Sequence, residues 1–124
     1  MSESDHQIAV VKWFKMQYPK HKGCIFSIPN GQMLGGRNKF ALMAKLKKEG
    51  FKNGVSDLFI AIPMNGKCGL WVEMKDAGKT QCDVKPAQQA HLDLMISMGY
   101  EGIWAAGSDI AMAAIKVYMK EAEL

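Results

Sequence analysis

Two carboxylates and an ammonium group stand at the ends of two consecutive apolar segments of this sequence. Asp57 opens the apolar run 58–62, and Glu73 and Lys75, separated by one residue, close the next run. Successive side chains of a strand point to opposite faces, so Glu73 and Lys75 share one face. Two carboxylates in an apolar environment repel each other and protonate unless a cation lies between them. The pattern is therefore typical of a site that holds a metal ion against a phosphate.

An Mg²⁺ or Mn²⁺ ion suits these groups best. Oxygen ligands without cysteine or histidine select a hard cation, and we expect Asp57, Glu73 and the backbone carbonyl of Met74 to hold it. Such an ion polarises the phosphoryl group and lowers the pKa of a bound water. Lys75 can then stabilise the phosphorane charge, or orient or deprotonate the attacking water. Gln88, on the following helix, is expected to hydrogen-bond to that lysine, to the water or to the phosphate.

Each of these residues also has a common structural interpretation. An Asp at the start of a strand is usually a turn residue, and a Glu-x-Lys at the end of a strand is usually a solvated ion pair. The runs 58–62 and 70–72 are nearly continuous in apolar residues, which implies burial on both faces of the sheet. Exposed ion pairs do not need such a setting, so we favour the metal site.

The turn between the two runs decides whether the carboxylates meet. A two-residue turn of Asn65-Gly66 would pair Met64 with Lys67 and put the two carboxylates on opposite faces. A three-residue loop that begins at Met64 pairs Pro63 with Lys67 and brings the carboxylates opposite each other, as would a bulge lower in the strands. We predict the three-residue loop.

Length and composition indicate one folded domain, 1–124, without repeats. Hydrophobic residues make up 48% and charged residues 23% of the chain, and the net charge of +4 with a pI near 9.0 favours a polyanionic partner. The cysteines, Cys24, Cys68 and Cys82, lack zinc spacing and are expected to be reduced. No signal peptide or membrane-spanning run is found, so we expect a soluble, cytoplasmic protein with no membrane partner and no small-molecule cofactor beyond the metal.

Apolar spacing, caps and breakers predict the order helix, strand, helix, two strands, helix, strand, helix, which is an α/β fold with a mixed sheet covered by helices. The first helix begins at Ser2 or Ser4, ends before Pro19, and carries an apolar side with Ile8 and Val11. A second helix follows Asn38 with Phe40, Met43 and Leu46 on one face, a third begins at Pro86, and the last begins at Ser108. His6, His21 and His91 are scattered and are taken as surface or structural residues.

Two further groups of residues are candidates, a pair on the first helix for the site itself and a set of basic residues for contact with a nucleic acid. Glu3 and Gln7 lie on one side of the first helix, where the carboxylate can face inward or stay a solvated first-turn acid. The densest basic patch contains Lys45, Lys47, Lys48 and Lys52, and Lys79 and Arg37 lie in glycine-containing loops. A solvated helix face is the usual meaning of such a patch, but its position before the acidic strand favours contact with phosphates.

Taken in order, the segments Gly-Val-Ser-Asp57, Val-Glu73-Met-Lys75 and Pro-Ala-Gln88 resemble the PD-(D/E)XK nuclease motif, and more closely its virus-type replication-repair nuclease branch, VRR-NUC. The likeness extends to Glu3 with Gln7, to Ile-Pro-Asn30-Gly31, and to the segment 99–105. Two positions depart from the pattern: Ser56 stands where the motif has proline, and Ser27 stands where many relatives have histidine.

The resemblance implies a restriction-endonuclease-like fold and Mg²⁺- or Mn²⁺-dependent hydrolysis of DNA, often at branched or flapped structures in replication, repair or recombination. It implies that Asp57 and Glu73 are metal ligands, Lys75 the catalytic lysine, Glu3 an additional acid and Gln88 an orienting residue. Asn30 is expected to contact the DNA, together with the basic residues. A likeness to Holliday-junction resolvases suggests a homodimer, and a virus-encoded protein acting in the host cytoplasm fits the same family. The alternatives are a non-catalytic DNA-binding module and a nuclease subunit targeted by a replication or helicase partner.

Overall fold

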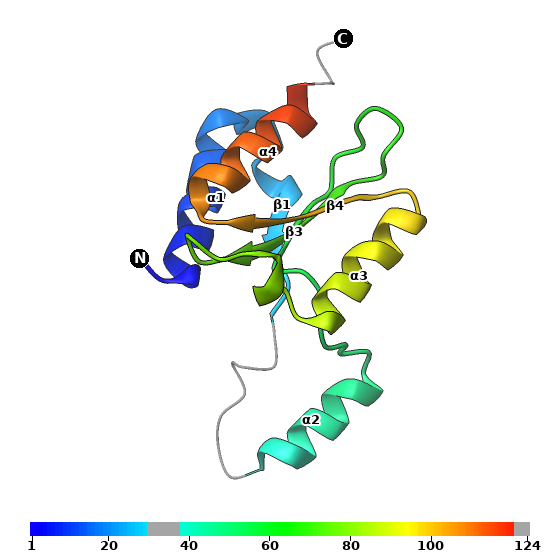
Figure 1. Cartoon of the computed structure of the whole chain (residues 1–124). Coiled ribbons are helices and arrows are strands. Elements are labelled where there is room, and N and C mark those ends of the chain that lie inside the picture. Colours follow the sequence, from blue (N-terminus) through cyan, green and yellow to red (C-terminus); the bar gives the residue numbers. More distant parts are fainter. Residues whose placement is uncertain (30–37, 121–124) are drawn as a thin grey trace.

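The computed structural model describes residues 1–29 and 38–120, and a four-stranded sheet of order β1-β2-β3-β4 forms its centre (Figure 1). β1, β2 and β3 pair as antiparallel neighbours, whereas β4 runs parallel to β3. The strands are β1 (Ile25–Ser27), β2 (Leu58–Ile60), β3 (Leu70–Lys75) and β4 (Glu101–Ala106). The helices are α1 (Glu3–Gln17), α2 (Lys39–Lys48), α3 (Pro86–Ser97) and α4 (Ser108–Lys120), with the 3₁₀ helices η1 (Pro19–Cys24) and η3 (Gln81–Asp83). The predicted element order and the single α/β domain are confirmed.

Helices cover the two faces of the sheet (Figure 1). On one face, Leu58 and Val72 of the sheet pack with Val10 and Phe14 of α1 and with Ile115 of α4, and all are buried. On the other face lies α3, the crossover that the parallel pair β3 and β4 requires. Because side chains alternate along β3, the odd-numbered residues face α3.

The first helix begins as predicted but buries a different side. The Ser2 Oγ accepts a hydrogen bond from the backbone N–H of Asp5 at 3.2 Å, which caps α1. The buried residues of α1 are spaced by four, at His6, Val10 and Phe14, whereas Ile8 is 62% exposed. The expected apolar side was therefore wrong at Ile8. The side that carries His6 faces the core instead, because polar partners outside the helix allow His6 to be buried.

The predicted three-residue loop is wrong. Met64 and Lys67 close the hairpin through backbone hydrogen bonds of 3.0 and 2.7 Å, and the two residues between them have positive φ, as in a type I′ turn. Lower in the strands the register changes, because Ile60 pairs with Leu70. Between this pair and the Met64–Lys67 pair, the β2 side of the hairpin therefore has three residues and the β3 side has two. This bulge produces the strand pairing in which Asp57 lies opposite Glu73, which the three-residue loop was expected to produce.

The second helix stands apart from the rest of the described structure (Figure 1). None of its residues is buried, Phe40 is 88% exposed, and Met43 and Leu46 are half-buried. The Asn38 side chain makes no capping hydrogen bond. The expected core-facing side of this helix is wrong, because no element within residues 1–29 and 38–120 covers it. None of the described helices is long and apolar enough to cross a membrane.

Candidate functional site

The bulged register brings the two carboxylates together at the end of the sheet. Continuing the pairing of Leu58 with Val72 by one residue places Asp57 opposite Glu73. The Asp57 Oδ2 atom accepts a hydrogen bond from the backbone N–H of Met74 at 2.8 Å, so this carboxylate is held at β3. The two residues face the α3 side of the sheet.

Glu73 is an acid in an unfavourable environment. Its side chain is 2% exposed. Burial raises the pKa of Glu73 to about 9, and the charge of Asp57 and a hydrogen bond with it act in the same direction. Lys75 opposes this shift. Without a bound cation, Glu73 is therefore protonated at neutral pH.

The geometry of this pair suits a hard divalent cation. The Oε2 atom of Glu73 is buried and has no hydrogen-bond partner among residues 1–29 and 38–120. A buried oxygen of this kind is costly unless a ligand engages it. Within the described ranges, no group of three or more His, Cys, Asp or Glu side chains is arranged to hold a metal. A cation held at this pair would therefore be met by the carboxylates of Asp57 and Glu73 and by a backbone group, not by a third acidic side chain.

The Met74 carbonyl is placed to be that backbone group. Along a strand, the N–H and C=O of one residue point to the same side, and the next residue points to the other. The Lys75 carbonyl accepts from the N–H of Gly107 at 2.8 Å, on the β4 side. Met74, whose N–H reaches Asp57, therefore directs its carbonyl to the β2 side, beyond the end of that strand.

Lys75 is held beside the carboxylates by one amide. Its side chain is 7% exposed, and its Nζ donates a hydrogen bond of 2.9 Å to Oε1 of Gln88. The same oxygen accepts the backbone N–H of Lys85 at 2.9 Å, just before the first residue of α3. Gln88 therefore joins the start of α3 to the ammonium group. The expected hydrogen bond between Gln88 and the lysine is present.

A cavity of about 580 Å³ opens in front of these groups, and α1 contributes to its wall. Asp57 and Lys75 line it from the sheet, Gln88 lines it from α3, and Glu3 and Gln7 line it from the first two turns of α1. Partial burial and then the charge of Asp57 raise the pKa of Glu3, so the two acids are electrostatic neighbours. Glu3 is thus an exposed residue of the first turn that also lines this cavity.

A second cavity of about 380 Å³ shares Asp57 and Gln88 with the first and extends toward α2. Glu73 lines it, together with Lys39 and Met43 of α2. Lys85 lines both cavities. Lys39 and Lys85 were not singled out from the sequence. The signal for Lys85 was its place three residues before Gln88, at the start of a helix.

The predicted nucleic-acid contacts are not gathered at the cavities. Lys45, Lys48 and Lys52 are exposed but line neither cavity. Lys79 is exposed in a turn after β3, where its backbone N–H donates to Asp76 at 3.2 Å. Asn30 and Arg37 lie outside the described residues. Contact of these residues with DNA remains a prediction.

Ser56, which departs from the proline of the motif, is fully buried against α3. Its N–H donates to Nδ1 of His91 at 3.3 Å, and its Oγ lies 3.1 Å from the same nitrogen. Burial, and then the charge of Lys52, lowers the pKa of His91, which keeps the ring neutral. Gly54 packs equally closely, because an added Cβ would lie 2.4 Å from the Ala87 carbonyl oxygen. These contacts fix the chain just before Asp57 on the first turns of α3.

Comparisons with known proteins point to one fold. No protein-family profile matches the sequence, and a search of curated proteins finds no match. Among solved structures, the chain matches a "VRR_NUC domain protein" with a TM-score of 0.81 and 28% sequence identity. The match covers 98% of this chain and 90% of that structure. The resemblance predicted from the motif is therefore confirmed, and the chain has the VRR_NUC fold.

Proposed function

We propose that this chain is a metal-dependent endonuclease that hydrolyses DNA phosphodiester bonds at branched structures such as four-way junctions or flaps. The observation that carries the proposal is the buried, unpartnered Oε2 of Glu73 beside Asp57. Asp57 also lines the first cavity, where it is joined by Lys75. The VRR_NUC fold, which implies a nuclease of the PD-(D/E)XK type, supports the same reaction class.

Asp57, Glu73 and the Met74 carbonyl would hold an Mg²⁺ or Mn²⁺ ion. When bound, the ion supplies a Lewis acid for a phosphoryl oxygen and lowers the pKa of water. The negative charge of Asp57 and the orphaned oxygen of Glu73 supply what such a hard cation needs. Proton release from Glu73 accompanies binding, because its carboxyl group is protonated at neutral pH in the free protein.

Lys75 acts on the phosphate or the water in this proposal. Gln88 holds its Nζ through one hydrogen bond, which leaves other N–H donors for an oxygen of the scissile phosphate or for the attacking water. A fixed cation of this kind stabilises the negative charge that grows on the phosphoryl oxygens. Glu3 faces the same cavity from α1 and is proposed as a further acid that reaches the metal or its water.

Lysines around the cavities give DNA a path to the site. Lys39 and Lys85 line the cavities and are proposed to contact the phosphates that flank the scissile bond. The exposed lysines of α2 and its C-terminal flank, Lys45, Lys48 and Lys52, extend this basic surface. A domain of this size offers little surface to a duplex, so we also propose that two copies act as a homodimer on branched DNA. Sedimentation as a monomer, together with full junction cleavage, would contradict the homodimer.

The function is tested by incubating the chain with a four-way junction, a 5′ flap and supercoiled plasmid, each with Mg²⁺, Mn²⁺ or EDTA. Cleavage that needs a metal and disappears in Asp57→Ala and Lys75→Ala is expected. Asp109→Ala, an exposed acid of α4, and Lys22→Ala, an exposed lysine that lines neither cavity, serve as matched controls that retain cleavage. Binding without cleavage under every metal condition would instead favour a non-catalytic DNA-binding module.

A further inference from the structure

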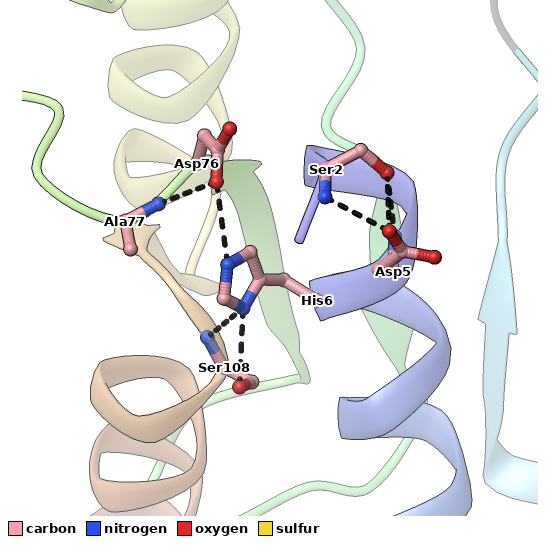
Figure 2. A network of polar contacts seen from close by, with 6 residues as sticks. All are labelled: Ser2, Asp5, His6, Asp76, Ala77 and Ser108. Carbon is pink, nitrogen blue, oxygen red and sulfur yellow. Dashed lines mark hydrogen bonds and ion pairs between the residues drawn. The ribbon is translucent and has the colours of Figure 1, made fainter.

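His6 is buried one helical turn beyond Glu3, at the point where α1 meets the ends of β3 and β4. Its side chain lies between Asp76, which follows Lys75, and Ser108, the first residue of α4 (Figure 2). It is 8% exposed and is the first buried residue of α1. Nothing in the proposed reaction requires an imidazole at this place.

Both ring nitrogens of His6 have partners. Nδ1 accepts a hydrogen bond from the backbone N–H of Ser108 at 3.0 Å, and the Ser108 Oγ lies 3.2 Å away. Since a backbone N–H can only donate, Nδ1 carries no hydrogen, and the neutral ring has its hydrogen on Nε2. Nε2 lies 3.3 Å from Oδ1 of Asp76, which also accepts the N–H of Ala77 at 2.8 Å (Figure 2).

These contacts link the end of β3 to the start of α4 and to the first turn of α1. The N–H of Gly107 donates to the Lys75 carbonyl at 2.8 Å, and the next residue, Ser108, donates to His6. His6 in turn reaches Asp76, the residue after Lys75. The first turn of α1 is therefore tied to the strand end that carries Lys75.

Glu3 lies in the same turn of α1, three residues before His6. Among the described residues, no hydrogen bond holds the Glu3 carboxylate, and the next buried residue of α1 after His6 is Val10. The first turn of a helix frays unless side chains fix it. The cap between Ser2 and Asp5 lies within the helix, and among the described residues the polar contacts of this turn with other elements are those of His6 with Ser108 and Asp76.

We propose that His6 is a positioning residue that holds Glu3 at the cavity, toward Asp57 and Lys75, and so sets the affinity of the site for its divalent cation. The proposal rests on the proposed function, because it takes Glu3 to act on the metal or its water. His6 itself touches neither substrate nor metal. Its two links are separable, since the Asn amide can replace Nδ1 and the Gln amide can replace Nε2 of histidine.

The test measures the dissociation constant of Mn²⁺ by titration calorimetry for the full chain and for His6→Ala, His6→Asn, His6→Gln and Glu3→Gln. We expect His6→Ala to weaken Mn²⁺ binding roughly tenfold, at the lower end of the effect of residues that orient metal ligands. His6→Asn, which keeps the bond to Ser108, and His6→Gln, which keeps the link to Asp76, should each recover part of this loss. His21→Ala, which removes an imidazole from η1, serves as the control and should leave binding unchanged.

Coupling to Glu3 separates a positioning role from a general loss of stability. In the Glu3→Gln background, His6→Ala should weaken Mn²⁺ binding no further, whereas a purely structural residue would add its own effect. Additive losses, or an unchanged affinity in His6→Ala, would overturn the proposal. If His6→Ala does not fold, the same cycle is run with His6→Gln and His6→Asn, and the same outcomes decide.

The proposed function and this inference fail in different ways. Loss of Mn²⁺ binding in Asp57→Asn together with unchanged binding in the His6 and Glu3 variants would overturn only the positioning role. Binding that survives Asp57→Asn, or no Mn²⁺ binding by the unaltered chain, would overturn the proposed metal site and this inference with it.

Discussion

Replacing Glu73 by glutamine should make the metal-free protein more stable at neutral pH. Glu73 has its pKa raised to about 9 in the fold by burial and by Asp57, against an ordinary value of 4.5. Between these two values the unfolded chain has lost the proton that the folded chain keeps, so the free energy of unfolding falls as the pH rises, by about 1.4 kcal/mol per pH unit. At pH 7 the acid therefore lowers stability by about 3 kcal/mol. Glutamine cannot ionise and keeps a donor for Asp57.

Urea unfolding in EDTA, followed by circular dichroism at pH 4.5 and pH 7, measures this difference. Glu73→Gln should exceed the unaltered chain by about 3 kcal/mol at pH 7 and by almost nothing at pH 4.5. Adding Mn²⁺ should stabilise the unaltered chain and leave the variant unchanged, because ligands of the folded state stabilise by mass action. Glu49→Gln, at an exposed acid that follows α2, is the control. A variant that is less stable than the unaltered chain at pH 7 would refute the unfavourable ionisation of Glu73.

Three further predictions concern the groups around the carboxylates. Gln88→Leu should lower the cleavage rate about tenfold, because the Lys75 ammonium loses its one described hydrogen bond, and single-turnover kinetics checks this. Ser56→Ala should lower the free energy of unfolding by about 1 to 2 kcal/mol, since it leaves buried His91 with one contact fewer, and Ser97→Ala at the exposed end of α3 should not. Lys39→Ala and Lys85→Ala should each weaken DNA binding and reduce the slope of log affinity against log salt by about 1, as fluorescence anisotropy would show.

The order of elements followed from local chemistry in the sequence. Ser2 caps α1, Pro86 opens α3, and both were recognisable from residue type and spacing. The run 70–75 was recognisable as a buried strand because it is apolar on both faces until Glu73. These features depend on residues close together in the chain, and periodicity and capping preferences are sufficient to predict them.

The hairpin between β2 and β3 combines a turn that its residue types predict with a bulge that they do not. Asn65-Gly66 does form the two-residue turn that its residue types favour, so the prediction of a longer loop was wrong. The requirement that the carboxylates share a face was met by the bulge at 61–63 instead. A bulge depends on how both strands pack against the rest of the sheet, and no short sequence pattern predicted its position.

The contacts of His6 and Ser56 could not be predicted for a related reason. His6 meets Ser108 and Asp76, which are distant in the chain, and a histidine in a first helical turn is ordinarily a surface residue. The isolated position of α2 was equally hidden, because Phe40, Met43 and Leu46 have the spacing of a core-facing helix. Sequence periodicity predicts an apolar face but not what covers it.

The most direct test of the central claim is the cleavage rate of a four-way junction as a function of Mn²⁺ concentration, compared between the unaltered chain and Asp57→Asn. This substitution keeps the shape of the side chain and removes the charge that a cation at Glu73 needs. We expect metal-dependent cleavage by the unaltered chain and a rate lower by about a thousandfold in the variant, since the metal lowers the activation barrier by several kcal/mol. Equal rates for the two proteins, or cleavage that continues in EDTA, would contradict a metal-dependent active site at Asp57 and Glu73.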